Sequence, residues 1–182
     1  MTASVAPGRR GLPNHVVGMA LLVTTELMFF AGLVSALVVS RANTTVWTLE
    51  GQPRLPVERT AFNTALLLLS GWTMIRAVGR RGSQGSPEWL ARTALLGAGF
   101  VLLQGVEWVR LLRVGLTLTS SLTGAFFYLI VGAHALHAMA GVALVGAAGV
   151  WPRRRPLVEA AAIYWWFVVG LWPILYVLVY LG

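Results

Sequence analysis

Five apolar stretches, each long enough to cross a lipid bilayer, fill nearly the whole sequence. A transmembrane helix needs about 20 predominantly apolar residues. Of all residues, 57% are hydrophobic and only 11% are charged, a balance that a water-soluble domain of this size could not bury. The sequence therefore predicts an all-α, polytopic membrane bundle, with residues 1–182 forming a single transmembrane domain. The five predicted helices are residues 16–40, 57–78, 90–112, 122–150 and 158–181.

The charge distribution indicates topology rather than nucleic-acid binding. The net charge of +8 comes from arginines that cluster between the apolar stretches, and no basic stripe with interleaved aromatic residues occurs on a polar segment. Arginine is enriched in cytoplasmic loops, and nine arginines against five place the amino terminus in the cytoplasm and the carboxyl terminus outside. The nine are Arg9, Arg10, Arg76, Arg80, Arg81, Arg92, Arg153, Arg154 and Arg155, and the five are Arg41, Arg54, Arg59, Arg110 and Arg113.

Cysteine is absent, so this chain alone cannot form a disulfide, an iron-sulfur cluster held by cysteine or a cysteine-ligated copper centre.

Glu26 is the first ionisable residue that the predicted helices place at membrane depth. No basic residue lies within a turn or two on its own helix. Because a charge at the bilayer centre is costly, we expect a neutral, protonated carboxyl. It can act as a structural hydrogen-bond donor to a neighbouring helix or, where water reaches it, handle a proton.

Two further helices carry polar residues on one face. Gln104 and Glu107 are three residues apart on the third helix, and Arg110 beyond them offers Glu107 a local ion pair. Asn63 and Ser70 share a face of the second helix and are expected to form hydrogen bonds between helices.

His134 and His137 are three residues apart on the fourth helix, so both can face one metal ion, and they are the first candidates for metal ligands. Further ligands would have to come from Glu26, Glu107 or His15, and haem ligation in bundles usually takes one histidine from each of two helices. We therefore expect hydrogen-bonded packing histidines and no metal bound by this chain.

Glycines in the fourth stretch suit close approach of another helix. They are Gly132, Gly141, Gly146 and Gly149.

Taken together, these motifs resemble the last five helices of subunit III of cytochrome c oxidase. They occur in the family's order and at matching spacing from about Leu12 to Gly182, which is more specific than any single motif. The matches are residues 25–30 to the family's Ser-Glu-x-Met-Phe-Phe stretch, residues 63–71 to its Leu-rich motif, Gln104 and Glu107 to its Gln-x-x-Glu, residues 126–141 to its Phe-Phe, Gly-x-His-x-x-His, Gly pattern, and residues 164–176 to its final-helix signature.

The last helix departs from the family pattern. Where the family has Tyr-Trp-His-Phe-Val-Asp, this chain has Trp166 and Val169 in place of the histidine and the acid, and Pro173 is expected to kink the helix. The resemblance begins at the third helix of the seven-helix members. We therefore do not expect this chain alone to form the lipid-holding cleft that those members build with their first two helices.

The resemblance implies a non-catalytic subunit III of a haem-copper terminal oxidase in aerobic respiratory electron transport, in the bacterial cytoplasmic membrane. Its expected partners are oxidase subunits I and II, which would hold the haems and copper, and phospholipids. Expected roles are stabilising the catalytic subunit, binding lipid and supporting proton uptake, and Glu26 matches the family's carbodiimide-reactive carboxyl.

Two alternatives remain open from the sequence. The altered last helix fits a subunit-III-like accessory protein of a nitric oxide reductase or of a respiratory supercomplex. A free-standing channel or carrier that uses Glu26 and His134 is the other alternative, and the lack of an internal repeat and of helices broken by glycine or proline argues against it.

Overall fold

The computed structural model describes residues 12–43, 55–79 and 86–181. All five α-helices are long and apolar enough to span a membrane, and these ranges contain no strand. The predicted all-α, five-helix membrane fold is confirmed. The elements are α1 (Asn14–Asn43), α2 (Val57–Gly79), α3 (Pro87–Arg113), α4 (Leu122–Val150), α5 (Arg155–Tyr176) and a π-helical segment, η1 (Val177–Leu181).

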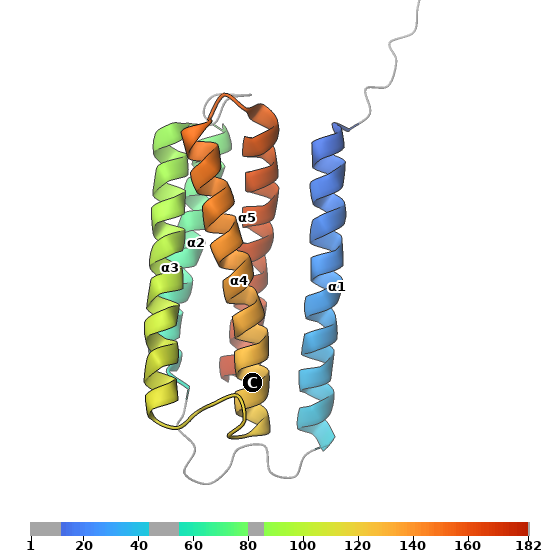
Figure 1. Ribbon diagram of the computed structural model, residues 1–182, viewed down its shortest axis with the longest axis vertical. Coiled ribbons are helices and arrows are strands. Elements are labelled where there is room, and N and C mark those ends of the chain that lie inside the picture. Colours follow the sequence, from blue (N-terminus) through green and yellow to red (C-terminus); the bar gives the residue numbers. More distant parts are fainter. Residues whose placement is uncertain (1–11, 44–54, 80–85, 182) are drawn as a thin grey trace, which may run out of the picture.

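The helices run up and down, so α1, α3 and α5 all begin at the same end of the molecule (Figure 1). We call this the amino-terminal end, and the other the opposite end. Which end faces the cytoplasm stays a prediction. Five arginines used in that count, namely Arg9, Arg10, Arg54, Arg80 and Arg81, lie outside the described residues.

Local sequence explains where α3 ends and where α4 begins. Gly115 adopts φ +88°, and Leu116 and Gly115 donate backbone hydrogen bonds to Leu111 (3.0 Å) and Leu112 (3.1 Å). This is a Schellman motif, in which a glycine accepts the left-handed conformation that closes the helix. The Ser121 hydroxyl then accepts a hydrogen bond from the Gly124 amide at 3.0 Å and caps α4.

The core of the bundle is built around Trp165 on α5, which is fully buried. A Cβ at Gly97 of α3 would lie 2.5 Å from the indole Cη2, and one at Gly141 of α4 would lie 2.8 Å from its Cε3. The indole Nε1 donates to the Ser70 hydroxyl of α2 at 3.2 Å. Three helices therefore meet around one indole, and α3 and α4 approach it at glycines that leave room for the ring.

The predicted role of the α4 glycines is confirmed for Gly141. A Cβ at Gly146 would have no atom of the described residues within 4 Å, so none of the described helices approaches there. A Cβ at Gly132 would lie 3.3 Å from the Trp108 ring, and one at Gly149 would make an ordinary 3.7 Å contact. The spacing of small residues in the sequence does not show which face of α4 packs against Trp165.

Helix α1 flanks the bundle formed by α2 to α5, and among the described helices it packs mainly against α5 and, less extensively, α4 (Figure 1). Phe30 and Leu37 are its only buried residues in the described chain. At the amino-terminal end, His15 Nε2 lies 2.7 Å from Glu159 Oε2 on α5. Because lipid solvates apolar side chains as well as protein does, polar contacts and close packing decide how firmly such a helix is held.

Pro173 lies inside α5, and the helix continues through it. Proline has no amide hydrogen to donate to the preceding turn. Four residues later the chain widens into the π-helical segment η1. Whether Pro173 bends α5 stays a prediction.

The Trp165 packing predicts opposite effects for two glycine substitutions on α4. Gly141→Ala should lower the free energy of unfolding by about 1 to 3 kcal/mol, because a methyl group would overlap the indole. Gly146→Ala should leave stability unchanged or raise it slightly, since alanine is the better helix former by about 1 kcal/mol. Thermal unfolding in mild detergent measures both, and equal midpoints for the two variants would contradict this account of the core.

Candidate functional site

Glu26 and His137 join α1 to α4 near the middle of both helices. Glu26 Oε2 lies 2.9 Å from His137 Nε2, and the two side chains are 27% and 17% exposed. Neither lies near a helix end. The structure therefore brings a carboxyl and an imidazole together at membrane depth, with part of the pair open to the surface of the bundle.

The second imidazole nitrogen determines how this pair shares protons. His137 Nδ1 lies 2.7 Å from the Ala133 carbonyl oxygen, which can only accept, so Nδ1 carries a proton and donates it. Nε2 then either accepts the acid proton of Glu26 or donates from an imidazolium to the Glu26 carboxylate. In both forms one proton lies between the two atoms and the pair is neutral overall, which lowers the cost of burying it.

Aromatic rings from α1 and α5 surround His137. Its ring centroid lies 5.2 Å from that of Phe30 and 6.0 Å from that of Phe167, both edge to face. Tyr164 stacks at 6.5 Å, with an angle of 18° between the planes. These contacts hold the imidazole in place, while the Glu26 side chain stays partly exposed.

His134 differs from the expectation of a hydrogen-bonded histidine. It is 1% exposed, and neither ring nitrogen has a hydrogen-bond partner among the described residues. Its ring packs against Trp172 at 4.8 Å and against Phe100 at 6.2 Å. His134 therefore belongs to the aromatic core and lies apart from the Glu26 contact, although one helix carries both histidines.

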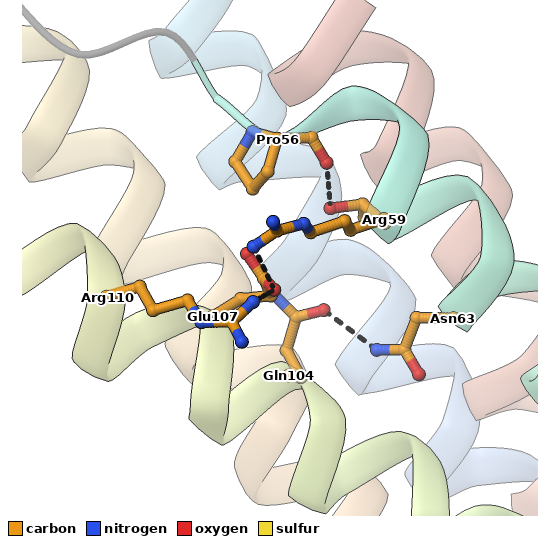
Figure 2. A network of polar contacts seen from close by, with 7 residues as sticks. Pro56, Arg59, Asn63, Gln104, Glu107 and Arg110 are labelled. Carbon is orange, nitrogen blue, oxygen red and sulfur yellow. Dashed lines mark hydrogen bonds and ion pairs between the residues drawn. The ribbon is translucent and has the colours of Figure 1, made fainter.

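Asn63, Gln104 and Tyr180 form a buried chain of hydrogen bonds from α2 through α3 to η1. Asn63 Nδ2 donates to Gln104 Oε1 at 3.1 Å (Figure 2) and to the Phe100 carbonyl at 3.2 Å. Gln104 Nε2 donates to the Tyr180 hydroxyl at 2.9 Å. Within the described part of the chain, Asn63 Oδ1 has no hydrogen-bond partner.

Glu107 lies one turn beyond Gln104 and pairs with arginines. Arg110 Nη1 donates to Glu107 Oε1 at 2.8 Å, and Arg59 Nη1 of α2 lies 3.6 Å from the same oxygen. Figure 2 shows both guanidinium groups converging on this carboxylate. The local pair with Arg110 is the one that the sequence spacing indicates, whereas the contact from Arg59 depends on how α2 and α3 pack.

Sequence reasoning missed the partners that come from other helices. Tyr180 carries no signal of its own, because a tyrosine near a helix end is usually an interfacial anchor. Glu159, which binds His15, lies four residues after Arg155 and also accepts from its Nε at 2.6 Å. That i,i+4 spacing is visible in the sequence, but the contact with α1 is not.

The two positions at which the last helix departs from the family pattern differ in burial. Val169, which replaces the family's acid, is buried and packs against Gly71, where a Cβ would lie 2.9 Å from its Cγ1. Trp166, which replaces the family's histidine, is 43% exposed beside α1. Among the described residues, no three His, Cys, Asp or Glu side chains are grouped so that they could hold a metal ion.

Comparison with known proteins gives consistent matches. The family model described as cytochrome c oxidase subunit III matches residues 8–182. Cytochrome c oxidase subunit 3 of Synechocystis is 32% identical, with 99% of this chain and 81% of the relative covered. That of Corynebacterium diphtheriae is 32% identical over 92% of this chain and 88% of the relative, and a probable subunit 3 of Mycobacterium leprae is 33% identical over the same shares.

The shared proton predicts different outcomes for two substitutions at Glu26. Glu26→Gln keeps a donor for His137 Nε2 and should leave α1 docked, whereas Glu26→Leu leaves that nitrogen unpaired at a cost of about 1 to 3 kcal/mol. Because the chain has no cysteine, spin labels at Met28→Cys and Leu136→Cys, both exposed positions, report the distance from α1 to α4. The distribution should broaden in the leucine variant alone, and equal widths in both variants would contradict the role of this contact.

Proposed function

The chain belongs to the cytochrome c oxidase subunit III family, and we propose that it acts as the non-catalytic subunit III of a haem-copper terminal oxidase. The observation that carries this proposal is the family match over residues 8–182, in a chain whose five helices can span a membrane. The proposed location is the bacterial cytoplasmic membrane, where aerobic respiratory electron transport takes place. The chain is thus a multi-pass membrane protein that works within an oxidase complex.

In this proposal the chain packs beside oxidase subunits I and II, which hold the haems and copper, and stabilises the catalytic subunit. Helix α1 supports such a role, because most of its large apolar side chains face away from the bundle. Phospholipid or a helix of a partner subunit can cover that surface. Binding of phospholipid is part of the same proposal.

Support of proton uptake is assigned to Glu26 and His137. The pair holds one proton at membrane depth, and the Glu26 side chain is 27% exposed. An ionisable residue inside a membrane is a functional-site hypothesis by default. The role proposed here is to take up and release that proton at the surface of the subunit.

Copurification tests the assignment to an oxidase. A tagged chain extracted in mild detergent should bring haem-containing partners with it and consume oxygen. A chain that emerges alone and without haem absorbance contradicts the proposal. Haem together with consumption of nitric oxide, and not of oxygen, would assign the chain to a nitric oxide reductase instead.

Carbodiimide labelling tests the role of Glu26, because carbodiimides react with protonated carboxyls in apolar surroundings. Glu26→Gln should abolish labelling while the complex still assembles. Glu58→Gln, at the exposed start of α2, should leave labelling unchanged and serves as the control. Loss of assembly in Glu26→Gln would show that this carboxyl is structural first, and undiminished labelling would place the reactive group elsewhere.

A further inference from the structure

A groove of about 380 Å³ lies between the first turns of α2 and the last turns of α3. Its polar lining comes from Glu58, Arg59, Glu107 and Arg110, and its apolar lining includes Phe62. Phe62 is 70% exposed on the outer surface of the bundle. The groove thus combines charges of both signs with an apolar wall on the outer surface of the bundle.

The two arginines of the groove share one carboxylate among the described residues. Arg59 and Arg110 both direct Nη1 toward the same oxygen of Glu107, at 3.6 Å and 2.8 Å. A guanidinium has five N–H donors in a planar fork, and these side chains are 63% and 53% exposed. One carboxylate balances only one of the two positive charges, so these three side chains have an excess positive charge, and the planar guanidinium groups suit a phosphate group.

Glu58 gives the rim of the groove a carboxylate without a partner. In the part of the chain that the structure describes, it makes no ion pair with an arginine or histidine, and it is exposed in the first turn of α2. A ligand that brings a phosphate to the arginines can therefore bring a cationic group to Glu58. When Glu58 is counted with the other three charged side chains, the groove has a net charge of zero. A zwitterionic headgroup also has a net charge of zero.

The groove lies at the depth of lipid headgroups. α2 begins at Val57 and α3 ends at Arg113, so the four charged residues lie within the terminal turns of two membrane-spanning helices. The polar headgroup region lies just outside the hydrocarbon core of a bilayer, and a phospholipid placed there directs its acyl chains along the exposed apolar side chains of Phe62 and Val106.

We propose that this groove binds a phospholipid with an amine-bearing zwitterionic headgroup, phosphatidylethanolamine. The phosphate lies against Arg59 and Arg110, and the primary ammonium donates to Glu58. The proposal deepens the lipid-binding role given above and rests on it. It differs from a general affinity for lipid because phosphatidylcholine has no N–H to donate and phosphatidylglycerol has no positive charge.

Native mass spectrometry of the full-length chain in detergent tests the site, with the three lipids added separately and carrying identical acyl chains. Phosphatidylethanolamine should bind most tightly to the unmodified chain. Arg59→Gln and Arg110→Gln should each weaken its binding about fivefold, the effect of a partly exposed charge contact. Glu58→Gln should remove the preference for phosphatidylethanolamine over phosphatidylcholine. Arg113→Gln, an exposed arginine one turn further along α3 that does not line the groove, should change nothing.

Each contrary result has a distinct meaning. If Arg59→Gln and Glu58→Gln bind all three lipids as the unmodified chain does, the groove is not the site, and the general lipid-binding role stands. If Glu58→Gln keeps the preference for phosphatidylethanolamine, the assignment of the ammonium is wrong. If the unmodified chain retains no phospholipid, both the groove and the lipid-binding role are overturned. Glu58 makes no ion pair in the described chain, so its substitution tests the site without disturbing the contact between α2 and α3.

Discussion

Close approach of three helices around the buried Trp165 indole is the contact on which the bundle depends. In lipid, burying apolar side chains between helices releases no ordered water, so association relies on packing and on hydrogen bonds. Gly97 and Gly141 let α3 and α4 come up to the indole ring, and Ser70 accepts its N–H. A second indole, Trp172, repeats the pattern by donating to Thr64 Oγ1 of α2 at 2.8 Å. The two indoles of α5 therefore position α2, α3 and α4 around it.

The same physics explains why α1 is attached differently. Among the described residues its buried side chains are Phe30 and Leu37, and its polar contacts with α4 and α5 include two between a histidine and a glutamate. His15 binds Glu159 at the amino-terminal end, and Glu26 binds His137 at mid-depth. In a helix surrounded by lipid, such polar links fix register and rotation. The proposed proton site and the attachment of α1 are therefore one structural feature.

Val169, one of the departures in the last helix, is closely packed. Val169 replaces the family's acid with an aliphatic side chain that fills the space beside Gly71, so no unpaired carboxylate has to be accommodated. A further polar connection between helices, formed by Asn63, Gln104 and Tyr180, lies nearer the opposite end of the molecule. Family membership is thus consistent with a changed final helix, because the hydrogen-bonded chain does not pass through the changed positions.

The sequence alone determined the number of helices, their limits to within a few residues and the family, because lipid forces every long apolar stretch into a helix that satisfies its own backbone. It also indicated the pair between Glu107 and Arg110, which is local. Tertiary structure decided the rest. That Glu26 meets His137 and not His134, that Arg59 joins Glu107, and that Gly141 and not Gly146 is approached all depend on the rotation of one helix against another. Helix rotation is set by the summed packing of many side chains, and no single spacing in the sequence encodes it.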